Sequence, residues 1–373
     1  MQENVIIGFD AKRIVSNGTG LGSYGRTLVN DLAGMSGITL RLYAPTPGRD
    51  DLRQQVTRHP HVTFCYAPPS HLPFSRQLWR SKLMVDNLVA DGVDIYHGLS
   101  GELPIGIRRH GIKTVVTIHD LIFMRHPEYY HWIDTKIYEW KFRQTLKEAD
   151  RIIAISECTK RDIMELGHVP ADRIDVIYQS CATKLATTLP ADVLERVRQK
   201  YAIPRRFILS VGTIERRKNL LLAVRALDLL PDDIHLVAIG RQTDYAKEIP
   251  PSSRIHLLSG ISNEELAAFY QLAEVFVYPS RYEGFGIPII EAIHCGLPVV
   301  ACTGSCLEEA GGPDNIYVHP DNVEAMATAI CQSLCGADGR QERIDRSRQY
   351  VRRFEGNDVA GQVVKLYHSL LST

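Results

Sequence analysis

The segment from Glu283 to Glu291 combines two carboxylates with glycines and a proline. Pro288 is typical of the first turn of a helix, so a helix is predicted to begin here. Gly284 and Gly286 allow the backbone to approach a ligand closely at that helix N-terminus. Glu291 falls about one turn inside the helix among apolar residues, where an unpaired carboxylate is costly. A pair of ribose hydroxyls would satisfy this carboxylate, and a structural hydrogen bond is the alternative.

Two adjacent cations, Arg217 and Lys218, follow a predicted strand and stand at the start of a predicted helix. Arginine suits bidentate contact with a phosphate, and lysine adds a compact point charge. Two cations are unfavourable beside the positive N-terminus of a helix unless an anion lies between them. The pair therefore predicts a phosphate site, and a solvated helix end is the alternative.

The first half of the chain has candidate residues at comparable positions. Gly20 and Gly22 precede a predicted helix and leave backbone N–H groups for an anion; a tight turn between strand and helix is the alternative. They do not complete the G-x-G-x-x-G fingerprint of dinucleotide-binding folds. His119, beside Asp120, ends a predicted buried strand, and His97 ends another. Each histidine either packs in the core or touches a substrate.

Short β-branched runs alternate with helical patterns along the chain, and these elements must position the candidate residues. Strands are predicted near residues 5–9, 39–43, 94–97, 114–118, 151–155, 174–177, 207–211, 235–239, 255–257, 275–278, 299–301 and 316–318. Helices are predicted near residues 23–32, 77–90, 134–149, 158–166, 219–230, 263–273, 287–295, 323–334, 340–353 and 357–371. This alternation, present in both halves, predicts an α/β fold with two doubly wound, Rossmann-like domains. Ligands bind such sheets outside the carboxyl ends of the strands, so we expect two such ends to face each other across a cleft.

The length of 373 residues fits two domains better than one. We predict an N-terminal domain over residues 1–180, a linker over 181–204 and a C-terminal domain over 205–353. Residues 354–373 form a further helix in this prediction. The linker assignment rests on the lack of a strand pattern between residues 178 and 204.

Composition excludes several classes of protein. The chain has 43 Lys and Arg residues against 43 Asp and Glu residues, so a general binder of nucleic acid is disfavoured. No apolar run is long enough to span a membrane, and the N-terminus lacks a signal-peptide pattern, so we expect a cytoplasmic protein. The eight cysteines include no C-x-x-C pair and are predicted to be free thiols rather than metal ligands.

With these residues in place, the chain resembles glycosyltransferase family 4, whose members are retaining enzymes of the GT-B fold. The segment from Glu283 to Glu291 resembles the family's E-x7-E motif. Other segments resemble its diphosphate loop (211–219, with Thr213 where many members have arginine), its N-terminal glycine loop (20–24), its His-Asp segment (118–121) and, more loosely, its Ser-x-Leu-Pro-Glu segment (305–309, with Glu308 in place of proline).

The resemblance implies transfer of a sugar, mannose or another hexose, from a GDP- or UDP-linked donor to a hydroxyl of a glycan or lipid-linked acceptor. Such a reaction would serve surface polysaccharide synthesis, with retained configuration and with neither cofactor nor metal. The implied catalytic residues are His119, Arg217, Lys218 and Glu283. The implied donor-binding residues are Gly20, Gly22, Gly212, Thr213, Gly284, Phe285, Gly286, Ile287, Glu291 and Ser305. Acceptor-side candidates are Tyr24, His97 and Asp120, and the last helix is expected to cross back onto the N-terminal domain.

Residues 73–84 are basic with interspersed aromatics, and the resemblance implies peripheral contact with the inner face of the membrane here; a solvated face is the alternative. Two other functions stay open at this point. One is a protein that binds a nucleotide sugar without turnover, and the other is a dinucleotide-dependent oxidoreductase. Acceptor-dependent release of a nucleoside diphosphate would exclude the first, and failure to bind NAD would exclude the second.

Overall fold

The computed structural model describes residues 4–69, 74–179, 185 and 187–372. The chain forms two compact units. Unit 1 contains the residues up to Gln179 together with those from Asp358 onward, and unit 2 contains the residues between them. The boundary predicted at residues 180–181 lies outside the described residues.

Unit 1 is built on a seven-stranded sheet in the order β3-β2-β1-β4-β5-β6-β7, with all neighbours parallel. The strands are β1 (Val5–Asp10), β2 (Ile38–Ala44), β3 (Val62–Tyr66), β4 (Ile95–Gly98), β5 (Lys113–Ile118), β6 (Arg151–Ala154) and β7 (Ile174–Val176). The helices are α1 (Lys12–Ser16), α2 (Gly20–Ala33), α3 (Asp50–Arg53), α4 (Ser75–Leu78), α5 (Met84–Ala90), α6 (Ile122–Arg125), α7 (Trp132–Glu148), α8 (Glu157–Gly167) and α16 (Val359–Leu371), with a π-helical turn at Trp79–Leu83.

The strands near the middle of this sheet are buried on both faces, which is why they read as continuous apolar runs. β3 is the one strand that the sequence pattern missed among the described residues. It lies at the edge of the sheet and is only partly buried, so its apolar signal is weak.

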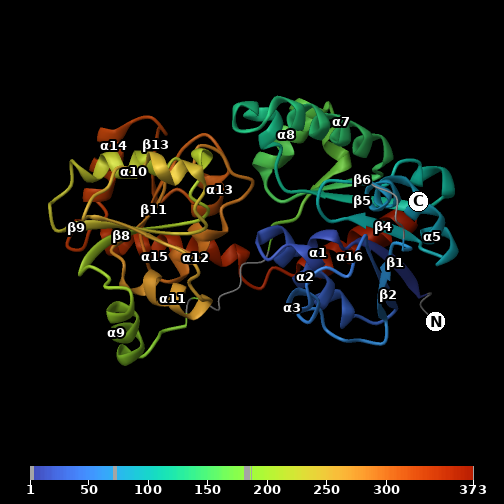
Figure 1. Ribbon diagram of the computed structural model, residues 1–373, viewed down its shortest axis with the longest axis horizontal. Helices are drawn as coiled ribbons and strands as arrows, with labels where there is room; N and C mark the ends of the chain where they lie inside the picture. Colours follow the sequence, from blue (N-terminus) through green and yellow to red (C-terminus); the bar gives the residue numbers. More distant parts are fainter. Residues whose placement is uncertain (1–3, 70–73, 180–184, 186, 373) are drawn as a thin grey trace. The chain divides into compact units, whose positions relative to one another are not determined.

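The C-terminal helix α16 belongs to the core of unit 1 although it follows unit 2 in the sequence. Val359, Val363, Leu366 and Leu370 recur at helical spacing and are buried in the same cluster as β1 and α2. Figure 1 shows α16 in red beside the blue α2. Unit 1 is therefore assembled from both ends of the chain.

Unit 2 is built on a six-stranded parallel sheet in the order β10-β9-β8-β11-β12-β13. The strands are β8 (Arg206–Val211), β9 (Ile234–Ile239), β10 (Ile255–Leu258), β11 (Val275–Tyr278), β12 (Val299–Cys302) and β13 (Ile316–Val318). The helices are α9 (Ala191–Lys200), α10 (Leu220–Leu227), α11 (Asn263–Leu272), α12 (Ile287–His294), α13 (Leu307–Gly311), α14 (Val323–Cys331) and α15 (Arg340–Val351). Within this unit, α10 and α14 cover one face of the sheet and α12 and α15 the other (Figure 1).

Residues 187–204, which the sequence assigns to a linker, belong to unit 2. Their helix α9 packs against α11, and Tyr201 lies against Phe269 with 5.5 Å between ring centroids. The segment lacks a strand pattern because it is helical, so the absence of a strand did not mean the absence of packed structure.

The predicted fold class is confirmed: each unit is a doubly wound parallel sheet. In the part of the chain that the structure describes, no helix is long and apolar enough to cross a bilayer.

Candidate active site

The strand order of unit 2 reverses between β8 and β11, and the loops that follow these two strands carry the predicted site. Gly212 and Thr213 follow β8, and Glu283 lies in the loop that follows β11. Ligands of doubly wound sheets bind at such a point because the two loops leave the sheet in opposite directions. The residues of both loops therefore meet although about seventy positions separate them.

Arg217, Lys218 and Glu283 form one ion cluster at this point. Lys218 Nζ lies 2.5 Å from Glu283 Oε1, and Arg217 Nη1 lies 2.9 Å from Glu283 Oε2. Burial alone would raise the pKa of Glu283, but the two cations outweigh it and lower this pKa to about 2. Burial would lower the pKa of Arg217 and of Lys218, and Glu283 reverses this and raises both. All three side chains are therefore charged at neutral pH.

Carboxylates of the protein itself supply the negative charge that was predicted to lie beside Arg217 and Lys218. Arg217 and Lys218 lie in a tight 3-10 turn, and α10 begins only at Leu220. Their charges are balanced by Glu283 and, for Arg217, by Glu215 at 2.7 Å. A diphosphate at this place would compete with these carboxylates for the same cations.

Tyr278 holds Lys218 in position. The ammonium donates a hydrogen bond of 2.6 Å to the Tyr278 hydroxyl, at the end of β11. Arg217 is held in a similar way, because its Nη1 donates to the Tyr282 carbonyl at 2.6 Å. The sequence analysis missed Tyr278, although its place at the carboxyl end of β11 could have indicated it.

Two glycines of the site have backbone conformations that favour glycine. Gly212 has φ of 142° and Gly286 has φ of 121°. Gly286 immediately precedes α12, where a Cβ would also meet Ala310 at 3.2 Å. The predicted loop-to-helix turn at 284–288 is thus present, with Ile287 as the first residue of α12.

Ser305 lies buried with a hydroxyl that has no hydrogen-bond partner among the described residues. A buried hydroxyl without a partner is costly, so this atom is suited to contact a ligand. Phe285 differs, because its side chain is buried against Phe354 and only its backbone is suited to bind a ligand.

Glu291 lies inside α12 and accepts a hydrogen bond of 3.0 Å from the Tyr270 hydroxyl. Burial raises the pKa of Glu291 to about 7, and the Tyr270 hydrogen bond opposes this only in part. The structural hydrogen bond that was the alternative is therefore present on one oxygen. A carboxylate has further acceptor sites, so Glu291 can also accept hydrogen bonds from ribose hydroxyls.

In unit 1, the acceptor-side candidates His97 and Tyr24 lie buried in the core. His97 is fully buried, with Nδ1 at 2.6 Å from the Tyr367 hydroxyl and Nε2 at 2.8 Å from Thr117 Oγ1. Tyr24 is 8% exposed and its hydroxyl lies 3.3 Å from the same Thr117 oxygen. These side chains form a buried polar chain that ties α2, β4, β5 and α16 together.

His119 is held by two contacts in unit 1. Its Nε2 lies 2.9 Å from the Leu99 carbonyl, and Gln179 Nε2 lies 2.9 Å from its Nδ1. The carbonyl can only accept and the amide nitrogen can only donate, so the ring is the neutral tautomer with its proton on Nε2. Burial lowers the pKa of His119 to about 4, which agrees with a neutral ring.

A cavity of about 240 Å³ lies beside His119 and Asp120. Its lining combines aromatic, acidic and basic side chains, among them Tyr138, Glu102 and Lys141. Asp120 also accepts a hydrogen bond from the backbone of Ile122 at 3.2 Å. The predicted His-Asp segment therefore lines a cavity large enough for a small ligand.

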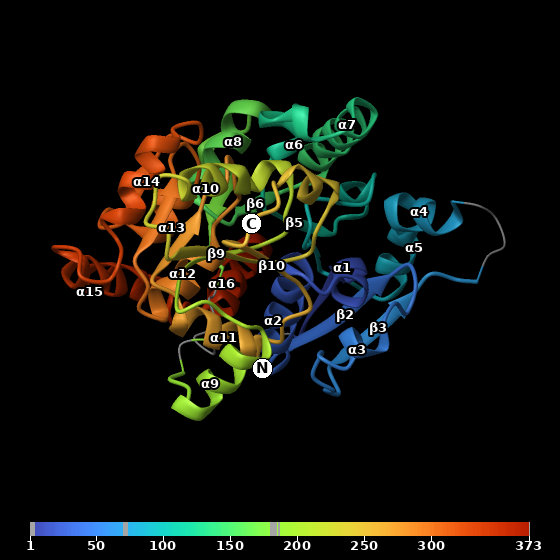
Figure 2. The same cartoon turned by 60° about the vertical axis from the view of Figure 1, so that its left-hand side comes forward.

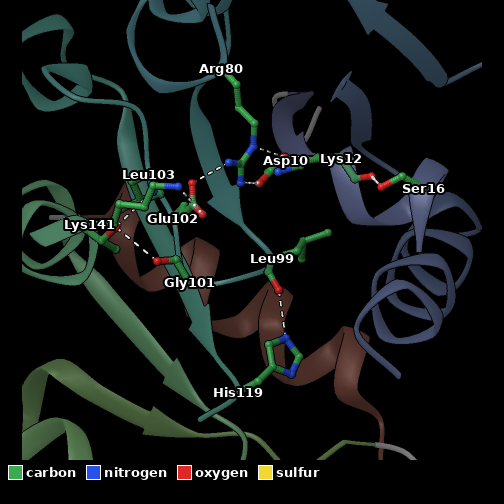
Figure 3. Close-up of polar contacts among 11 residues, drawn as sticks. Asp10, Lys12, Ser16, Arg80, Leu99, Gly101, Glu102, Leu103, His119 and Lys141 are labelled. Carbon is green, nitrogen blue, oxygen red and sulfur yellow. Dashed lines mark hydrogen bonds and ion pairs between the residues drawn. The ribbon is translucent and has the colours of Figure 1, made fainter. Parts of the chain in front are cut away.

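A charged network that the sequence analysis missed borders this cavity (Figure 3). Arg80 lies between Asp10 and Glu102 and pairs with both, and Lys141 lies 3.4 Å from the other oxygen of Glu102. Burial alone would raise the pKa of Asp10, but Arg80 lowers it below its ordinary value. The four residues come from four separate segments of the chain, so no sequence spacing indicates them.

The glycine loop of unit 1 differs from its prediction. Gly20 and Gly22 are not free in a loop but form the first turn of α2. A Cβ on Gly22 would lie 1.9 Å from the Asn17 carbonyl oxygen and 2.8 Å from that of Arg13. Close packing of α2 on the preceding turn is sufficient to require glycine here, whereas Gly20 meets nothing within 4 Å.

Comparison with known proteins decides the family. The model of Glycosyl transferases group 1 matches residues 194–350, and that of Glycosyltransferase Family 4 matches residues 18–183. The O-antigen chain mannosyltransferase B of Escherichia coli is 31% identical over 297 residues, which are 74% of this chain and 74% of that protein. This chain belongs to glycosyltransferase family 4. It is therefore a glycosyltransferase, and the oxidoreductase alternative is set aside.

Solved structures agree on the GT-B fold of this glycosyltransferase. A glycosyltransferase from Rickettsia africae ESF-5 has a TM-score of 0.77 at 19% identity and covers 100% of this chain and 99% of its own. Anabaena Alr3699/HepE, solved in complex with UDP and glucose, has a TM-score of 0.73 at 18% identity and covers 99% of this chain and 100% of its own.

Proposed function

We propose that this family 4 enzyme transfers a hexose, mannose in the first instance, from a nucleotide-diphosphate sugar to a hydroxyl of a glycan or lipid-linked acceptor in surface polysaccharide synthesis. The similarity to an O-antigen chain mannosyltransferase supports the sugar and the process. The observation that carries the proposal is the cluster of Arg217, Lys218 and Glu283, with Glu291 on the helix that follows.

The cations act on the leaving group in this proposal. When the bond from the anomeric carbon to the diphosphate oxygen breaks, negative charge grows on the diphosphate, and Arg217 and Lys218 stabilise it. The backbone N–H groups of Phe285 and Gly286 and the hydroxyl of Ser305 bind the same donor. Glu291 accepts hydrogen bonds from the ribose hydroxyls.

Configuration is retained because the acceptor attacks the face that the diphosphate leaves. The bond from the acceptor oxygen to the anomeric carbon forms there, and the acceptor's proton passes to the departing diphosphate oxygen. No protein base is required for this proton. The neutral His119, held by Leu99 and Gln179, contacts the sugar near the reacting carbon, and Asp120 helps to bind the acceptor in the adjoining cavity.

The reaction runs without a metal ion in this proposal, because two cations and the N–H groups preceding α12 already provide positive charge. We also propose that the protein is cytoplasmic and that its donor sugar is linked to GDP or UDP. UDP is the nucleotide bound in the Anabaena protein, and this supports UDP as one of the two candidate nucleotides.

Thermal unfolding with UDP, GDP, ADP, NAD and common nucleotide sugars tests the proposal. A ligand at about 100 times its Kd adds about 2.7 kcal/mol of stability, which such a measurement detects. We expect one nucleoside diphosphate to stabilise the wild type and to lose this effect in Glu291→Ala. Stabilisation by NAD alone, or by no nucleotide, would contradict it.

A turnover assay then separates a transferase from a protein that only binds the donor. The expected result is release of the nucleoside diphosphate that depends on an added glycan acceptor. Tight donor binding without such release, across acceptors that include lipid-linked glycans, would favour the binding protein.

A further inference from the structure

Helix α7 exposes four large apolar side chains on one face. Trp132 is 73% exposed, Ile133 52%, Ile137 44% and Trp140 52%. Their sequence spacings of one, four and three residues bring the four side chains to one side of the helix, where they form a single stripe along about two turns. A soluble surface rarely gathers large apolar groups in this way unless something covers them.

The cations of α7 lie on the same face. Helical spacing places Lys136, Arg143 and Lys147 alongside the stripe, and the first two have side chains 73% and 50% exposed. Glu139 at the edge of the face is 26% exposed and pairs with both of these cations. One carboxylate thus serves two cations, and the face has an excess of positive charge.

The other two acids of α7 lie on the side of this face away from its cations. Glu148 accepts hydrogen bonds from the backbone N–H groups of Gly106 and Arg108 at 2.8 and 3.3 Å. Helical spacing places Asp134 about 60° from Ile137, at the edge of the stripe, and about a third of a turn or more from the tryptophans and the three cations. The exposed face therefore combines tryptophan, isoleucine, lysine and arginine, the residues typical of helices that lie in a membrane interface.

The opposite side of the same helix lines the cavity beside His119. Tyr138, Lys141 and Phe142 all belong to α7 and all line this cavity. Figure 2 shows α7 on the outside of unit 1 next to α6, which it contacts. A single helix thus connects an apolar, basic outer surface with the proposed acceptor cavity.

We propose that the outer face of α7 lies on an anionic lipid surface, with the tryptophans and isoleucines among the acyl chains and the cations at the lipid phosphates. The inference rests on the proposed function in one respect: a lipid-linked acceptor would hold its glycan at this surface, within reach of the cavity behind α7. Apolar burial and attraction to anionic headgroups act together in such binding.

Residues 73–84, where the sequence analysis expected membrane contact, fit this role less well. Residue 73 lies outside the described residues. Trp79 is buried, and Arg80 is engaged by Asp10 and Glu102. Exposed apolar groups remain at Phe74 and Leu78, so this segment is the natural comparison for α7.

Sedimentation with vesicles tests the proposal on the full chain. The wild type should bind vesicles that contain phosphatidylglycerol and bind pure phosphatidylcholine vesicles much more weakly. The double variant Lys136→Gln/Arg143→Gln should reduce binding about thirtyfold, at about 1 kcal/mol for each cation. Trp132→Ala/Trp140→Ala should reduce it more than about tenfold through lost apolar burial.

Leu229→Ala is the matched control, because Leu229 is 56% exposed on unit 2, and it should not change vesicle binding. Equal binding to both kinds of vesicle, or no binding by the wild type, would overturn the proposal. So would loss of binding in Phe74→Ala/Leu78→Ala with retention in the α7 variants. A dimer that Trp132→Ala/Trp140→Ala dissociates, with no vesicle binding, would assign the face to a second copy instead.

Failure of this proposal is distinguishable from failure of the proposed function. The α7 variants should keep the nucleotide-induced stabilisation and should transfer sugar to a water-soluble acceptor at the wild-type rate. Vesicle binding by a protein that no nucleotide stabilises would support the surface and contradict the function.

Discussion

The pKa of Glu291 leads to a prediction on stability. This pKa rises from 4.5 to about 7 on burial, so the folded protein holds a proton that the unfolded chain has released. The free energy of unfolding must then fall as pH rises from about 4.5 through 7. One pKa unit corresponds to about 1.4 kcal/mol. Above pH 7 the ionised Glu291 carboxylate therefore lowers the free energy of unfolding of unit 2 by up to about 3 kcal/mol.

Replacing Glu291 by glutamine removes this cost and keeps the size of the side chain. We expect Glu291→Gln to raise the free energy of unfolding by about 2–3 kcal/mol at pH 8 and to change it little at pH 5. The measurement is urea unfolding at both pH values, followed on the transition of unit 2. Glu264→Gln on the exposed surface of α11 is the control and should show no such difference.

A gain of the same size at pH 5 and pH 8 would refute this reasoning, because the carboxylate would then not titrate between them. The same titration should appear in binding. If the ionised carboxylate holds the ribose, wild-type affinity for the nucleoside diphosphate falls by up to about tenfold for each pH unit below 7, while Glu291→Gln shows a flat profile.

Four further outcomes are expected. Lys218→Ala should lower kcat far more than it changes KM for the donor, since the charge acts on the leaving group; a normal rate at saturation would count against this. Gly22→Ala should lower the free energy of unfolding of unit 1 by about 1–3 kcal/mol through overpacking; an unchanged midpoint of thermal unfolding would show that the added methyl group fits beside α2. Tyr367→Phe should cost about 1–3 kcal/mol in urea unfolding by leaving His97 Nδ1 unpaired; no loss would mean that the bond is dispensable. Activity should survive a strong chelator, and a loss that magnesium or manganese restores would require a metal.

The central strands of both sheets were predictable because they are buried on two faces and read as apolar runs, whereas the partly buried edge strand β3 was not. The burial of His97 has a physical cause that the sequence does not show. His97 and His119 both stand at carboxyl ends of buried strands, but His97 is also covered by α16, whose Tyr367 hydroxyl it contacts. Tyr367 lies 270 residues from His97, and no local pattern contains that information.

The candidate site was predictable as a set of loops but not as a cluster. Glycines and cations after β8 and β11 indicated an anion site, yet Glu283 as the counter-ion of Arg217 and Lys218 depends on β8 and β11 being neighbours in the sheet. The network around Arg80 is further from prediction, since its partner Asp10 is the last residue of β1, its partner Glu102 lies after β4, and the two show no shared spacing.

The split composition of unit 1 has a consequence for the order in which the protein matures. During synthesis the first 179 residues leave the ribosome long before α16, so their core lacks the helix that covers α2 and pairs with His97. Unit 2 is complete earlier and can fold before α16, the last element of unit 1, has been synthesised. A nonsense mutation that removes only the last dozen residues would therefore leave unit 2 able to fold. The same mutation would destabilise unit 1, although most of unit 1 is translated first.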